Sequence, residues 1–78
     1  MTTSRAKKRT FVICVRNDGY EVSLEKRKIY EAIEDQDATK HQQLRVVDES
    51  GDDYLFPANF FVFVELPKPT QRAVIQAA

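Results

Sequence analysis

The chain has 78 residues, of which 42% are hydrophobic and 31% charged, and this composition predicts one small soluble domain. Its single cysteine excludes an internal disulfide, and no apolar run approaches the roughly 18 residues of a membrane span. The 12 basic and 12 acidic side chains balance, but the basic ones gather at both ends and leave residues 11–66 acidic. With no targeting segment visible, we expect a cytoplasmic protein.

The first nine residues are small, polar or basic, and we expect a disordered basic arm over residues 1–9. A run of β-branched and aromatic side chains follows and predicts a strand over residues 10–16. Its alternation places Val12 and Cys14 on one face. We therefore expect Cys14 to be a packed core residue rather than a reactive thiol.

The next stretch, residues 21–34, fits either a helix or a strand. Its Leu, Glu, Lys and Ala residues are good helix formers, but the apolar stripe is thin and the helix-capping signal is incomplete. An Asn-Asp-Gly-Tyr turn signal precedes it. The context favours a loop over 17–27, a strand near 28–34 and a polar loop over 35–42.

The second half of the sequence predicts three strands separated by turns. We expect strands over residues 43–48, 53–56 and 61–66, a hairpin turn at 49–52 and a single tight turn at 58–60. Two prolines end the last strand, and residues 67–78 form a C-terminal tail with at most a frayed helical turn over 70–78. Five short strands predict an all-β barrel over residues 10–66, closed so that its last apolar strand is not an exposed edge.

Residues 54–61 read Tyr-Leu-Phe-Pro-Ala-Asn-Phe-Phe, which resembles the fourth strand, single-turn helix and fifth strand of Src-homology-3-type (SH3-like) barrels. Residues 28–33 resemble the second strand of that family. The resemblance implies a five-stranded barrel with a long first loop at residues 17–27 and a distal hairpin. Residues 48–57 also resemble a segment of small, uncharacterised bacterial proteins.

Ligand-binding members of the SH3-like family hold peptides in an aromatic groove between the first loop and the single turn. The resemblance implies a groove formed by Tyr20, Tyr54, Pro57, Asn59 and Phe60. The alternative is that Tyr54 or Phe56 fills the core and that Phe60 packs beneath the turn. The chain has no tryptophan and carries Phe60 where the family has a tyrosine. The resemblance therefore implies a binding module without implying a proline-rich ligand.

Two other features of the sequence could indicate a metal site. Four carboxylates, Asp48, Glu49, Asp52 and Asp53, surround one turn, but their spacing differs from that of a calcium loop and is typical of a solvated hairpin tip. His41 has no cysteine or carboxylate at metal-ligand spacing, so we interpret it as a loop residue. We expect no catalytic set, no metal and no cofactor.

These observations predict a non-enzymatic binding module whose partner is another protein. We expect a monomer or a weak homo-oligomer with no membrane contact. The alternative is nucleic-acid binding by a small barrel, aided by the basic arm. The arm consists of Arg5, Lys7, Lys8 and Arg9.

Overall fold

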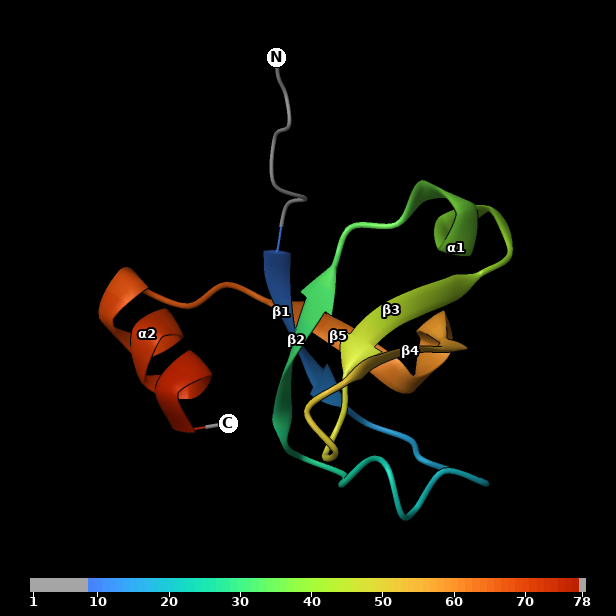
Figure 1. Ribbon diagram of the computed structural model, residues 1–78, viewed down its shortest axis with the longest axis horizontal. Coiled ribbons are helices and arrows are strands. Elements are labelled where there is room, and N and C mark those ends of the chain that lie inside the picture. The colour runs from blue at the N-terminus through green and yellow to red at the C-terminus, as the bar shows by residue number, and fades with distance from the viewer. Residues whose placement is uncertain (1–8, 78) are drawn as a thin grey trace.

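The computed structural model describes residues 9–77, in which five β-strands are accompanied by two α-helices and a 3-10 turn (Figure 1). The elements are β1 (Arg9–Cys14), β2 (Ile29–Ile33), α1 (Gln36–Lys40), β3 (Gln43–Val47), β4 (Asp53–Pro57), η1 (Ala58–Phe60), β5 (Phe61–Val64) and α2 (Lys68–Ala77). All five predicted strands are present, with ends within two residues of those expected. Neither helix of this described part of the chain is long and apolar enough to cross a membrane.

The strands form one antiparallel sheet in the order β4-β3-β2-β1-β5. The predicted closed barrel is wrong, because β4 and β5 are the two edges of this sheet and are not paired with each other. The segment that joins β4 to β5 explains why these two strands do not pair. Pro57 has no N–H to donate, and η1 follows it at once and redirects the chain, so β5 pairs with β1 at the other side of the sheet.

The core lies on one face of the sheet. Strand alternation brings Val12 and Cys14 of β1 next to Tyr30 and Ala32 of β2, in agreement with the predicted facing of β1. Cys14 is fully buried, as expected, and burial raises the pKa of its thiol. The remaining members of this core cluster are Leu24, Val46, Phe56, Phe60 and Phe61, with Leu44 packed against them.

Residues 29–33 form a strand, which resolves the choice between helix and strand for this stretch. β2 is the central strand of the sheet, with β1 on one side and β3 on the other. Tertiary pairing therefore outweighs the helix propensity of its Glu and Ala residues. The preceding residues 15–28 form the predicted long loop, in which Leu24 is buried against the core.

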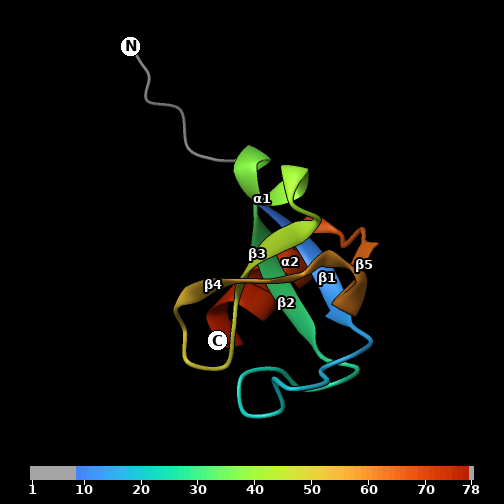
Figure 2. The same ribbon diagram turned by 90° about the vertical axis from the view of Figure 1, so that its right-hand side faces the viewer.

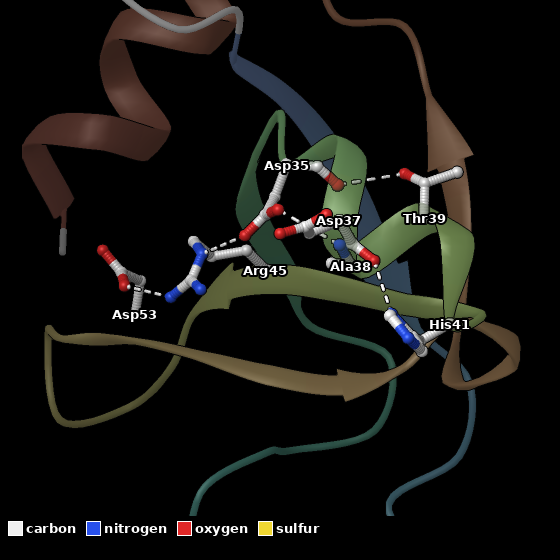
Figure 3. A network of polar contacts seen from close by, with 7 residues as sticks. All are labelled: Asp35, Asp37, Ala38, Thr39, His41, Arg45 and Asp53. Carbon is white, nitrogen blue, oxygen red and sulfur yellow. Dashed lines mark hydrogen bonds and ion pairs between the residues drawn. The ribbon is translucent and has the colours of Figure 1, made fainter.

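The helix α1 replaces part of the polar loop predicted over residues 35–42. Asp35 caps it, because its side chain accepts a hydrogen bond from the backbone N–H of Ala38 at 3.1 Å (Figure 3). Lys40 lies in the last turn, where a cation is favourable. Gln42, with a φ of 59°, turns the chain after the helix, and β3 begins at the next residue.

The helix α2 replaces the predicted tail, for which the sequence indicates at most a frayed turn. Pro69 lies in its first turn, where a missing N–H removes no helical hydrogen bond. The two views in Figures 1 and 2 place α2 beside β1 and β2, on the side of the sheet away from α1 and β4. Phe11 belongs to the face opposite the core and is nevertheless buried.

Candidate functional site

Three aromatic rings pack together where the long loop meets η1. The ring of Tyr20 lies edge-on to Phe56, at 5.3 Å between centroids, and to Phe60, at 5.7 Å. Phe56 and Phe60 are buried, whereas Tyr20 keeps 39% of its surface exposed. We call Tyr20, Phe56 and Phe60 the aromatic patch. It presents one tyrosine face to solvent above two rings of the core.

The loop holds Tyr20 in place with its own backbone. The Tyr20 N–H donates to the carbonyl of Asn17 at 2.8 Å, and the Tyr20 carbonyl accepts from the N–H of Leu24 at 2.9 Å. The Asn17 amide donates to the carbonyl of Leu24 at 3.0 Å. Gly19 supplies the positive φ of 82° that the turn requires. Because Leu24 is anchored in the core, these hydrogen bonds fix the position of Tyr20.

Charged groups border the patch at the end of β1. The guanidinium of Arg16 lies over the Phe60 ring, 5.8 Å from its centroid, and pairs with Asp18 at 2.6 Å. This hydrogen bond with Arg16 lowers the pKa of Asp18. The backbone N–H of Arg16 also donates to the carbonyl of Phe60 at 3.2 Å. The sequence carried no signal for this role, since Arg16 reads there only as the residue that ends an apolar strand.

The structure brings only part of the predicted groove together. Tyr20 and Phe60 are in contact, while Asn59 is exposed in η1 and Pro57 is half-buried at the end of β4. Tyr54 is 51% exposed, and the ring contacts of the described residues do not include it. Tyr54 and Phe56 share one face of β4, and of the two it is Phe56 that fills the core.

The acidic segment forms the predicted hairpin between β3 and β4. Asp48 is buried, and its carboxylate accepts a hydrogen bond from the N–H of Ser50 at 2.8 Å. Gly51 completes the turn with a φ of 89°. Glu49 and Asp53 each form an ion pair with a basic side chain. No group of three or more metal-ligating side chains occurs within residues 9–77.

The remaining predicted features lie elsewhere or outside the described chain. His41 caps α1, with its Nδ1 at 2.8 Å from the carbonyl oxygen of Asp37 (Figure 3). Arg5, Lys7 and Lys8 of the basic arm lie outside the described residues. Arg9 belongs to β1 rather than to a disordered arm, and it pairs with Glu31 at 2.8 Å.

We compared the chain with known proteins in three ways. No family model, no curated protein and no solved structure matches it.

Proposed function

We propose that this protein is a non-enzymatic binding module that holds an apolar segment of a partner protein on its aromatic patch. The observation that carries the proposal is the position of Tyr20, which is exposed yet packed edge-on against two buried rings. Rigid tyrosines of this kind supply large contact areas at a low entropic cost, and they are common hot spots of protein interfaces. Arg16 and Asp18 beside the patch pair with each other, which leaves aromatic surface as the main contact for a partner.

We further propose that the fold is an open variant of the SH3-like architecture. Three features support this proposal: a long loop after the first strand, a tight hairpin between β3 and β4, and a 3-10 turn between the last two strands. In such a fold, the surface between the first loop and the 3-10 turn is where a peptide would lie. The aromatic patch occupies that position.

A peptide-display selection tests the binding role. Random peptides selected on the wild-type protein should be rich in apolar residues, and Tyr20→Ala should weaken their binding by about tenfold or more, as expected for a hot spot. Val22→Ala is the matched control, because Val22 lies in the same loop and is 95% exposed. It should bind the selected peptides like the wild type.

Two results would count against this proposal. Selected peptides that bind the Tyr20→Ala variant as tightly as the wild type would remove the patch as the site. Tight binding of single-stranded RNA that weakens steeply with salt would favour the nucleic-acid alternative instead. The described part of the chain gives that alternative little support, because residues 9–77 carry nine basic and twelve acidic side chains.

A further inference from the structure

A cleft of about 560 Å³ lies between α2 and β2. Figures 1 and 2 show α2 beside β1 and β2, on the side of the sheet away from α1 and β4. This volume falls within the range of roughly 300–1,000 Å³ that is usual for small-molecule sites. A second hollow, beside α1, holds about 200 Å³ and falls below that range. The larger cleft is therefore the better candidate for a ligand.

Apolar side chains line the cleft on both of its sides. Ile29 and Val47 line it from the sheet, and Val74 and Ile75 line it from α2. Among the hydrogen bonds of the described residues, none joins α2 to the sheet. A helix of ten residues is marginal on its own, and α2 turns apolar side chains toward a space that the sheet does not fill. An apolar ligand in that space would bury both walls and stabilise the helix.

The acidic side chains that line the cleft are already engaged. Glu31 pairs with Arg9 at 2.8 Å, and Glu49 pairs with Lys28 at 2.7 Å. Asp48 is buried and accepts hydrogen bonds within its own turn. Ion pairs engage Glu31, Glu49 and Lys28, and hydrogen bonds from Ser50 engage Asp48, so none of these groups is available to a ligand without breaking an existing interaction.

Arg27 is the exposed lining charge for which the described residues provide no ion-pair partner; Asp48 forms no ion pair either, but it is buried. Its φ of 73° lies in the left-handed region, which is costly for a residue other than glycine. Glycine would adopt this φ without steric cost, so the backbone conformation of the turn does not favour an arginine here. One unpaired guanidinium at the edge of an apolar cleft matches a ligand with one anionic group and an apolar body.

We propose that this cleft binds a free fatty acid of medium chain length. The alkyl chain lies between Ile29 of β2 and Val74 of α2, and the carboxylate binds the guanidinium of Arg27. The site is separate from the aromatic patch, and the proposal does not depend on the proposed protein-binding function.

Titration of the whole protein with sodium decanoate, below its micelle concentration, tests the proposal by calorimetry and by ¹H–¹⁵N NMR. We expect saturable binding with shifts at Ile29, Val74 and Ile75. Decyltrimethylammonium should bind about tenfold more weakly or worse, because it cannot accept the charged hydrogen bonds of Arg27. Octanoate should bind more weakly by about fourfold for each methylene removed.

Arg27→Gly separates binding from folding. Glycine fits the positive φ, so this variant should unfold at the same temperature as the wild type or at a higher one. It should bind decanoate about tenfold more weakly while its affinity for decanol stays unchanged. Lys26→Ala is the matched control, since it removes a neighbouring exposed cation that does not line the cleft. It should bind decanoate like the wild type.

Three outcomes would overturn the proposal. The first is an absence of saturable decanoate binding. The second is an equal loss of affinity in Arg27→Gly and Lys26→Ala, which would indicate general charge attraction. The third is a set of shifts confined to Tyr20 and Phe60, which would place the amphiphile on the aromatic patch.

Discussion

The hydroxyl of Tyr30 connects β2 with the long loop and with the hairpin turn between β3 and β4. It accepts a hydrogen bond from the N–H of Glu25 at 2.7 Å and donates one to the carboxylate of Glu49, which also pairs with Lys28. Burial, and then the bond to Glu49, raises the pKa of Tyr30, while the bonds from Lys28 and Tyr30 lower the pKa of Glu49. The Glu49 contribution to the free energy of unfolding is complete above the ordinary carboxyl pKa and disappears as pH falls through its lowered value. The Tyr30 contribution is complete below the ordinary tyrosine pKa and disappears as pH rises through its raised value.

Tyr30→Phe should therefore destabilise the protein at neutral pH, where both contributions are complete. The change removes the hydroxyl and leaves the partly buried N–H of Glu25 without its acceptor, which costs about 1–3 kcal/mol. Tyr54→Phe is the matched control, because Tyr54 is half-exposed and the hydrogen bonds of the described residues do not include its hydroxyl. Urea unfolding at pH 7 gives both free energies. Equal stabilities for the two variants would show that the Tyr30 hydroxyl does not connect the loop to the hairpin.

The short helix α1 depends on one side chain, that of Asp35. Asp35 caps the helix and pairs with Arg45 of β3 at 2.8 Å, and Arg45 reaches on to Asp53 of β4 at 2.9 Å (Figure 3). These bonds raise the pKa of Arg45 further, so the guanidinium stays charged. A helix of five residues cannot persist alone, so this network positions α1 against β3.

Asp35→Ala should lower the free energy of unfolding by about 1–2 kcal/mol, the usual cost of losing a helix N-cap. Asp35→Asn should cost less, because asparagine still caps a helix but no longer pairs with Arg45. Asp37→Ala is the control, since it removes an exposed carboxylate from the same turn and should cost only a few tenths of a kcal/mol. Urea unfolding distinguishes the three variants. A larger effect for Asp37→Ala than for Asp35→Ala would contradict the capping role.

The strands could be predicted from the sequence and the helices could not, for physical reasons. Apolar alternation marks a strand even when it is short, and the turn residues at Gly19 and Gly51 bound these strands clearly. In α1 the helical signal is one capping aspartate followed by a single turn, too short for a hydrophobic period. In the sequence, Pro67 and Pro69 indicate the end of a strand, although Pro69 also fits the first turn of a helix such as α2.

The two surfaces that we propose as binding sites differ in how well they could be predicted from the sequence. The aromatic patch could be predicted in part, because Tyr20 lies in a predicted loop and Phe60 in the predicted tight turn after Pro57. Tyr54 and Phe56 lie two residues apart and face the same side of β4, so alternation does not decide which of them is buried. Phe56 is buried because Tyr20 and Phe61 pack against it, and the sequence alone does not give these tertiary contacts. The cleft under α2 could not be predicted, because it depends on where a helix that follows a proline-rich connection returns to the sheet.

The open sheet also leaves β5 as an unprotected edge. Its four residues are Phe, Val, Phe and Val, and Val62 and Phe63 are 53% and 61% exposed. An apolar edge strand can pair with another chain through its free N–H and C=O groups. An antiparallel β5–β5 pair would oppose no like charges, because β5 carries none. We expect weak self-association that grows with concentration.

Val62→Lys should suppress this association without unfolding the protein, since the side chain is already half-exposed and lysine on an edge strand opposes pairing. Val22→Lys is the matched control, because it adds the same charge in the long loop, away from the edge. Sedimentation velocity over a concentration series gives the result. The wild type and Val22→Lys should sediment faster as concentration rises, whereas Val62→Lys should stay at the monomer value. A wild type that remains monomeric throughout would contradict an accessible edge, and equal suppression by both lysines would show that net charge, rather than the edge, controls the association.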